Sequence, residues 1–151
     1  MSLALGASAV WVGTRFICAT EAGAPPHHQQ AVLSAGYHDT LRTLVFTGRP
    51  LRVKKNQYIH EWETTRREEQ EKLLAQGIVP VQHDIDAASA GELKNVDPQM
   101  VAEGRPLLMG QVAGAIEDIK PAKEIIDDMV RVAIQTLRDN YSMITPPAAK
   151  L

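Results

Sequence analysis

Trp11, Val12, Gly13 and Thr14 form the segment of this chain whose residue types and order could do chemistry. The segment ends an apolar run that reads as a strand. A glycine at the end of a strand lets a phosphate group approach the backbone, because it has no Cβ. The Gly13 and Thr14 amides and the Thr14 hydroxyl can donate hydrogen bonds to phosphate oxygens. Taken alone, a Gly-Thr pair is more often a simple turn, so the neighbouring segments must decide between the two interpretations.

The histidines offer no metal site with the usual ligand spacing. His27 and His28 are adjacent, so they cannot share one face of a helix, and we interpret them as a solvated pair near a helix start. His83 stands beside Asp84 and near Asp86, a group that could touch a metal ion. Acids beside a histidine are common in strands and turns, so we predict no metal site.

Other reactive residue types are interpreted as structural. Cys18 lacks an identified basic partner and is expected to be a small buried residue. Asp127 and Asp128 are adjacent on an expected helix, where neighbouring side chains diverge, so they form no acid–base pair. Trp11 and Trp62 are the usual types for packing.

Composition limits the classes of protein to consider. The chain has 151 residues, with 16 Lys and Arg against 18 Asp and Glu, a net charge of −2 and a single cysteine. This charge predicts no nucleic-acid surface, and no apolar run reaches the roughly 20 residues of a membrane helix. The lone cysteine excludes an internal disulfide framework and favours a reducing, cytoplasmic location. A complete (β/α)8 barrel needs about 200 residues or more, so this chain cannot contain one.

The first elements favour a chain cut from a longer one. Residues 9–16 are apolar and rich in β-branched and aromatic types, which predicts a strand buried on both faces. Residues 3–6 before it read as the end of a helix with Gly6 as its C-cap. A helix end followed by a buried strand is typical of the middle of a βαβ unit.

The remaining elements follow from periodicity and from Gly and Pro punctuation. We expect a helix from Pro26 to Ala35 capped by Gly36, a strand at 40–47 ended by Gly48-Arg49-Pro50, a surface helix at 61–76 stopped by Gly77, a short strand at 78–85, short helix and loop at 86–105, and a long amphipathic helix at 121–141. Gly110 and Gly114 are four residues apart, which on a helical face would allow another backbone or a ligand to approach closely.

Four segments in order carry a resemblance. They are residues 6–16 (GASAVWVGTRF), 19–22 (ATEA), 46–50 (FTGRP) and 110–114 (GQVAG). The series resembles the carboxyl-terminal part of the nitronate monooxygenase family, and the match runs from Leu3 to about Tyr141. The first and third segments are fairly specific to this family and its flavin-dependent enoyl reductase relatives.

The resemblance implies an α/β fold class: the last strand and closing helix of an incomplete FMN-binding TIM barrel, plus a small α/β (α+β) insertion domain. It assigns residues 1–20 to the end of the barrel and 21–117 to a substrate-side domain. Residues 118–144 would be a helix that packs on the barrel, and residues 145–151 a loose tail.

The resemblance also implies that the FMN phosphate lies against Trp11, Val12, Gly13 and Thr14, and that Gln111 faces the cleft between the domains. The earlier barrel strands of the family have no counterpart here. None of the five histidines stands in the context of the family's catalytic histidine, so we assign no catalytic residue to this chain.

We therefore expect a segment of an FMN-dependent enzyme that converts alkyl nitronates with O2 into carbonyl compounds and nitrite, and that contributes part of the phosphate site. Two alternatives stay open: a non-catalytic remnant or interaction module, and a flavin-dependent enoyl reductase. A phosphate site built from one strand end predicts weak or absent FMN binding by the isolated chain. An unpaired barrel edge predicts self-association.

Overall fold

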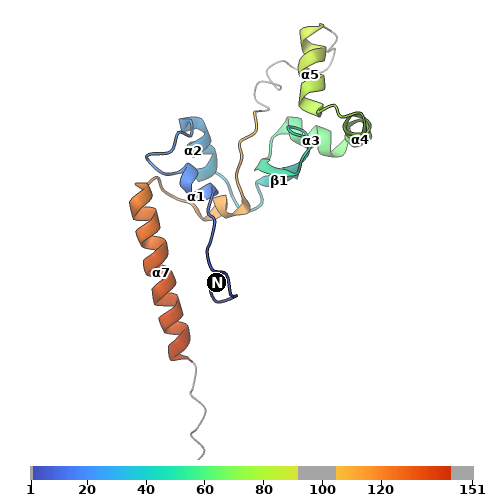
Figure 1. Cartoon of the computed structure of the whole chain (residues 1–151). Coiled ribbons are helices and arrows are strands. Elements are labelled where there is room, and N and C mark those ends of the chain that lie inside the picture. The colour runs from blue at the N-terminus through green and yellow to red at the C-terminus, as the bar shows by residue number, and fades with distance from the viewer. Residues whose placement is uncertain (1, 92–104, 144–151) are drawn as a thin grey trace, which may run out of the picture.

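The computed structural model describes residues 2–91 and 105–143. It is a mixed α/β chain of helices and a two-stranded sheet (Figure 1). The elements are α1 (Thr14–Ile17), α2 (Pro26–Leu33), β1 (Thr40–Thr43), β2 (Leu51–Lys54), α3 (Gln57–Thr64), α4 (Arg67–Ala75), α5 (Pro80–Ser89), the 3-10 helix η1 (Gln111–Ala115) and α7 (Ala122–Ser142).

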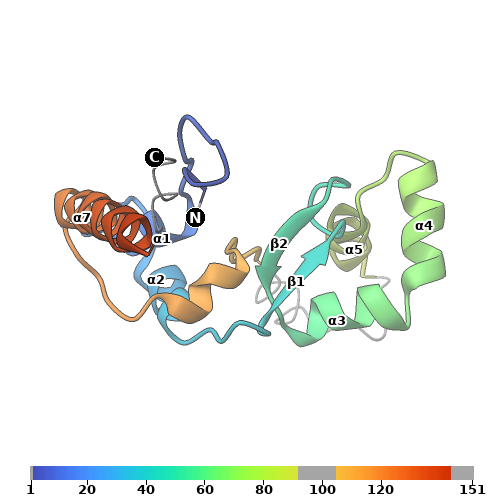
Figure 2. The same cartoon turned by 90° about the horizontal axis from the view of Figure 1, so that it is seen from below.

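Two hydrophobic cores hold these elements. The first core joins α1, α2 and η1 and consists of Cys18, Ala31, Val32, Ala35, Met109, Ala113 and Ile116. The second core joins the sheet to α3 and α4 and consists of Val45, Val53, Tyr58, Ile59, Trp62 and Leu73. In Figure 2, η1 lies between α2 and the sheet, so the segment around it connects the two cores.

The sheet is an antiparallel pair in which Thr40 lies opposite Lys54 and Thr43 opposite Leu51. The strand expected at 40–47 is confirmed for its first half only. It ends at Thr43 because the Thr43 hydroxyl accepts the Val45 amide at 3.1 Å, a local turn that takes the backbone out of the ladder. The chain then reverses through Gly48 at φ 66°.

The glycine stop expected at Gly77 is confirmed, and Gly6 has the same cap geometry without the helix that was expected before it. At Gly77, φ is 76°, its amide donates to the Leu74 carbonyl at 3.0 Å, and the Ile78 amide donates to the Leu73 carbonyl at 2.9 Å. The same pair of bonds surrounds Gly6, at φ 92°, although residues 2–6 form turns rather than a regular helix. Both are Schellman caps, in which glycine takes the left-handed conformation.

The helix expected at 61–76 is two helices, α3 and α4. Asn56 caps α3 by accepting the Ile59 amide at 2.8 Å, so the helix begins earlier than expected. Near its end the Thr64 and Thr65 hydroxyls donate to carbonyls four residues back, at 2.6 Å and 3.0 Å. Helix α4 starts after Arg66, whose amide bonds to the Glu61 carbonyl at 2.9 Å.

Two expected strands are wrong. Residues 78–85 fall mainly in helix α5, where Pro80 occupies the first turn, a position that proline suits because its missing N–H costs nothing there. Residues 9–12 are not a strand, and α1 starts at Thr14. A parallel strand needs neighbours to pair with, and within the described ranges residues 9–12 have none.

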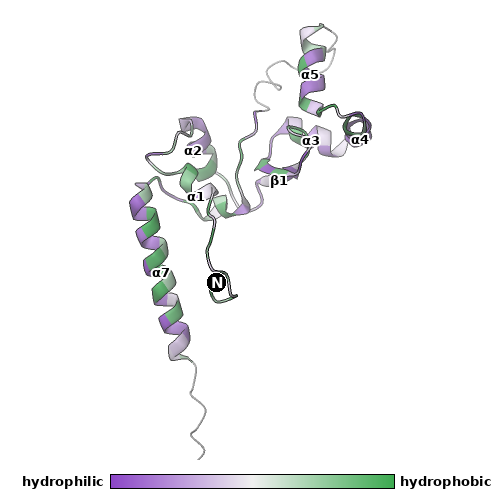
Figure 3. Ribbon diagram, viewed as in Figure 1, coloured by the Kyte–Doolittle hydropathy of each residue, from purple (hydrophilic) through white to green (hydrophobic). Residues whose placement is uncertain are grey.

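The other helices agree with expectation in type and differ at their ends. Helix α2 ends before Ser34, because the Gly36 amide instead donates to the Asp39 carboxylate at 2.8 Å. Helix α7 follows Pro121 as expected, and Ile125 is its buried residue. Figure 3 shows an apolar stripe along α7, which stands apart from the second core. No helix in the described ranges is long and apolar enough to cross a membrane.

Candidate functional site

The backbone at Gly13 is open to an approaching group. Gly13 immediately precedes α1, and a Cβ placed on it would meet no heavy atom within 4 Å in the described part of the chain. The first amides of a helix have no partner inside that helix, and Gly13 has no side chain to cap them. An acceptor such as a phosphate oxygen could therefore reach the Gly13–Thr14 backbone.

The Thr14 hydroxyl already has one partner. Its Oγ1 accepts the Gly110 amide at 2.9 Å, across 96 residues of sequence. A hydroxyl also carries one proton, so Thr14 keeps the ability to donate to an anion. Gly110 precedes η1, whose first residue, Gln111, is exposed. The structure thus brings the predicted phosphate turn and the Gly-Gln segment together, a contact that the sequence did not predict.

Trp11 and Val12 lie differently from Gly13 and Thr14. Trp11 is 98% exposed, so its interpretation as a packing residue is wrong; the strand that would have buried it is absent. Val12 is half-buried and lines a cavity of about 500 Å³ between residues 2–16 and α7. The four predicted residues therefore present an indole, an apolar wall and an open backbone rather than one enclosed pocket.

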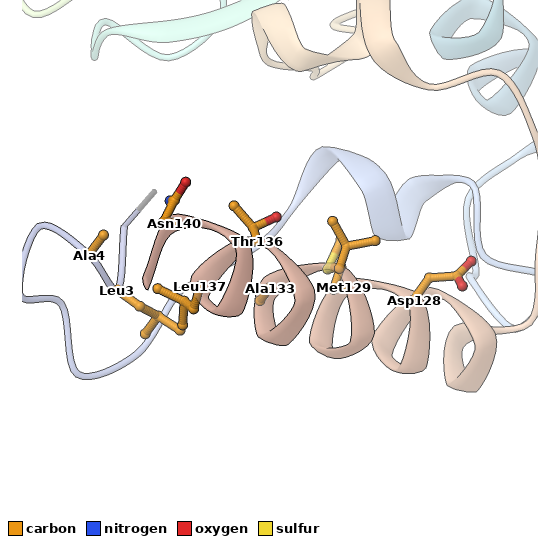
Figure 4. Close-up of a pocket in the computed structure, with 9 residues that line it drawn as sticks. Leu3, Ala4, Asp128, Met129, Ala133, Thr136, Leu137 and Asn140 are labelled. Atoms are coloured by element: carbon orange, nitrogen blue, oxygen red, sulfur yellow. The ribbon is translucent and has the colours of Figure 1, made fainter. Parts of the chain in front are cut away.

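The cavity beside Val12 continues along α7. A second cavity of about 490 Å³ shares Leu3, Met129 and Ala133 with it and extends toward Asn140 (Figure 4). We call the two together the α7 groove. Its walls are mostly apolar, so it suits hydrophobic contacts rather than an anion.

Arg15 is committed to holding α1 in place. Its guanidinium donates to the Asp118 carbonyl at 2.9 Å and also pairs with the Asp118 carboxylate. Lys120 Nζ lies 2.9 Å from the same carboxylate. The bonds from Lys120 and Arg15 lower the pKa of Asp118 below its ordinary value. This ion cluster ties α1 to the segment that leads into α7.

Of the remaining chemical candidates, His28 and Cys18 make structural contacts. His27 is exposed, and His28 bonds through Nε2 to the Leu108 carbonyl at 2.9 Å. Cys18 is buried, as expected, and burial raises the pKa of its thiol. In residues 2–91 and 105–143, no three His, Cys, Asp or Glu side chains gather closely enough to hold a metal ion.

Sequence reasoning missed the buried carboxylate of Asp84. It accepts the Tyr58 hydroxyl at 2.9 Å, the Trp62 Nε1–H at 3.0 Å and both terminal nitrogens of Arg66 at 3.0 Å. Burial raises the pKa of Asp84, but the bonds from Arg66 and Tyr58 outweigh it, so the pKa lies below its ordinary value.

The Arg66 guanidinium completes this network. It stacks 3.5 Å from the Trp62 ring centroid and pairs with Glu69 at 2.9 Å. The i,i+4 spacing of Trp62 and Arg66 was the available signal, but it reveals the site only once Asp84 is known to lie in a helix rather than in the expected strand.

Comparison with known proteins matches most of the chain to one family. The family model described as nitronate monooxygenase matches residues 1–131. A Mycobacterium tuberculosis protein named as a monooxygenase is 30% identical over 139 residues, which cover 90% of this chain and 36% of that protein. A Staphylococcus saprophyticus protein named as a nitronate monooxygenase is 38% identical over 60 residues, covering 40% of this chain and 17% of that protein.

A solved structure is similar over nearly the whole chain. FabK from Thermotoga maritima is 27% identical with a TM-score of 0.67, and the match covers 95% of this chain and 42% of FabK. The chain thus spans well under half the length of these relatives. The likeness supports the coarser part of the fold expectation, a partial barrel of a flavin-dependent TIM-barrel family.

Proposed function

The chain belongs to the nitronate monooxygenase family, and on this premise we propose that it forms the carboxyl-terminal part of an FMN-dependent oxidoreductase. The proposed substrates are an alkyl nitronate and O2, and the products are a carbonyl compound and nitrite. The division into residues 1–20, 21–117 and 118–144 stays a prediction; the expected tail at 145–151 lies outside the described residues.

The proposed contribution of this chain is one side of the FMN phosphate site. The observation that carries it is the open backbone of Gly13 beside the Thr14 hydroxyl, inside the region that the family model matches. Gly13 and Thr14 would donate to phosphate oxygens, Val12 would supply an apolar wall, and the exposed Trp11 would lie beside the cofactor. Flavin, when bound, supplies the redox chemistry, while these residues bind and orient it.

At this turn an anion would be bound by backbone N–H groups and a hydroxyl rather than by a cationic side chain. The guanidinium of Arg15, the residue after Thr14 in the sequence, is held by Asp118 and balanced by it. Binding by this chain alone therefore lacks a cationic partner, so we expect a dissociation constant on the order of 1 mM or weaker, about −4 kcal/mol.

An NMR titration of the full chain tests this proposal. With ¹⁵N-labelled protein, FMN is expected to shift the Gly13 and Thr14 amides more than riboflavin does, because only FMN carries the phosphate. Thr14→Val should reduce the shift, and Thr65→Val, whose hydroxyl donates to Glu61 inside its own helix, should leave it unchanged. Equal shifts with riboflavin and FMN, or shifts confined to other residues, would contradict the phosphate role.

A second candidate function is that of a flavin-dependent enoyl reductase, which the likeness to FabK favours. The two activities separate by their co-substrates. Oxidation of NAD(P)H with an enoyl thioester would support the reductase, while O2 consumption with propionate nitronate and no nicotinamide would support the monooxygenase. Absence of both activities in the isolated chain would favour the non-catalytic alternative for it.

A further inference from the structure

Residues 107–110 run as an extended segment, here called the strap, along the outer edge of β2. The Lys54 amide donates to the Leu107 carbonyl at 2.9 Å, and the Met109 amide donates to the Arg52 carbonyl at 3.2 Å. Leu108 forms an antiparallel bridge with Val53. The strap therefore pairs with the sheet of the second core.

The side chains of Leu107 and Met109 belong to the other core. Met109 is buried in the first core and Leu107 packs against it. The Leu108 carbonyl is held by His28 of α2 at 2.9 Å. The strap is thus bonded to the sheet through its backbone and to α2 through its packing and through His28, so it links the two cores.

The end of the strap is fixed by Thr14. The Gly110 amide donates to Thr14 Oγ1 at 2.9 Å, and a Cβ on Gly110 would lie 3.3 Å from the same oxygen. Four residues along, η1 is packed closely on its other side, because a Cβ on Gly114 would lie 2.5 Å from the Tyr37 amide nitrogen. The segment that carries Gln111 is therefore clamped between α1 and the connection from α2 to β1.

We propose that Thr14 is a positioning residue: its hydroxyl fixes Gly110, and through it the strap and Gln111, so that the turn at residues 12–15 and the β1–β2 sheet keep one mutual geometry. The Thr14 oxygen becomes a better acceptor when its own proton is donated to an anion, because hydrogen bonds in a chain polarise one another. An anion at the turn therefore strengthens the bond to Gly110. This second step rests on the proposed function; the first does not.

Amide hydrogen exchange in the full chain without ligand tests the first step. In the wild-type chain the Gly110 amide is expected to exchange as slowly as that of Met109. Thr14→Val should speed exchange at Gly110 about five- to tenfold, the effect of losing one neutral hydrogen bond, with a smaller increase at Met109 and Lys54. Thr14→Ser, which keeps the hydroxyl, should restore protection, and Thr65→Val is the matched control.

The outcomes separate positioning from general stability. Exchange that rises equally at Ile59 and Trp62, in the second core, would mean only that Thr14→Val loosens the whole fold, and would overturn the proposal. A wild-type Gly110 amide that exchanges like an open one would overturn it without any variant. Protection that Thr14→Ser fails to restore would do the same.

Titration with inorganic phosphate tests the second step. The expected result is a shift at Gly13 and Thr14 accompanied by slower exchange at Gly110 and Met109, with the latter lost in Thr14→Val. If phosphate shifts the Gly13 and Thr14 amide signals but leaves the exchange rate of the Gly110 amide unchanged, the coupling is overturned and the phosphate site is not. Phosphate that shifts nothing would overturn the proposed function and the second step, while the exchange data still decide the first.

Discussion

Asp84 and Arg66 face each other in a two-pronged ion pair, with both terminal guanidinium nitrogens 3.0 Å from the carboxylate and Asp84 fully buried. Tyr58 and Trp62 donate to the same carboxylate. Four donors from α3 and the start of α4 thus converge on one acceptor of α5. Because Tyr58 and Trp62 also belong to the second core, the ion pair joins α5 to that core.

Replacing Asp84 with Asn should destabilise the second core. The change leaves the Arg66 charge without its buried partner, and Arg66 is itself only partly exposed, so we expect a loss of about 3 kcal/mol in the free energy of unfolding. Urea unfolding followed by Trp62 fluorescence measures it. Glu71→Gln is the control, because its pair with Arg67 is exposed on both sides. A change equal to the control would contradict the role of Asp84.

The same carboxylate should make stability depend on pH. Its pKa is lower in the folded chain than its ordinary value near 4, so its stabilising contribution is complete above that value. The contribution is lost as the pH falls through the folded pKa, because protonation breaks the pair with Arg66. Urea midpoints measured from pH 7 down to pH 2 should fall more steeply in the wild-type chain than in Asp84→Asn. Parallel profiles would disprove the linkage.

Gly114 and Gly110 should respond differently to alanine. At Gly114 the added Cβ would lie 2.5 Å from the Tyr37 backbone nitrogen, which cannot move without shifting the chain, so we expect a loss of about 2 kcal/mol. At Gly110 the nearest atom is Thr14 Oγ1 at 3.3 Å, which need shift only slightly to make room, so the loss should be smaller. Thermal unfolding of the two variants compares them directly. An equal or reversed order would show that η1 is not clamped at Gly114.

The apolar face of α7 should drive self-association. Ile126 and Val130 are about half exposed on this helix, at 50% and 53%, and a face of this kind is costly to leave in water. Sedimentation of the wild-type chain should show oligomers, and Ile126→Glu with Val130→Glu should shift it toward monomer while the circular dichroism stays helical. Gln135→Glu, on an exposed residue bonded to Asp139, is the control. A wild-type chain that stays monomeric at all concentrations would contradict the prediction.

The sequence correctly predicted the elements that depend on interactions between residues close together in the chain. The amphipathic period of α7 and the left-handed glycines Gly6 and Gly77 act within a few residues, so the sequence was sufficient for them. The strand predicted at residues 9–16 was wrong, because a strand forms only if another strand pairs with it. Pro80 was read as an interruption of a strand, although it equally suits the first turn of α5.

In the candidate site, too, some features follow from the local sequence and others depend on tertiary contacts. Gly13 and Thr14 stay a prediction from residue type and order. The close approach expected at Gly110 and Gly114 is present, but not on one helical face, because Gly110 is extended and only Gly114 lies in η1. The groups that approach these glycines are Thr14 and Tyr37. They are distant in the sequence, so only the tertiary fold reveals them. Asp84 was read as one acid beside a histidine, because nothing local connects it to Arg66, 18 residues earlier.

The bond between Thr14 and Gly110 joins the beginning of the chain to its last third, 96 residues away. Synthesis proceeds from the amino terminus, so Thr14 leaves the ribosome long before its partner exists. Closing so long a loop also carries an entropic cost that earlier, local contacts must first offset. The turn near Gly13 therefore reaches its final shape only after translation has passed Gly110, because before that point the Thr14 hydroxyl has no Gly110 amide to accept.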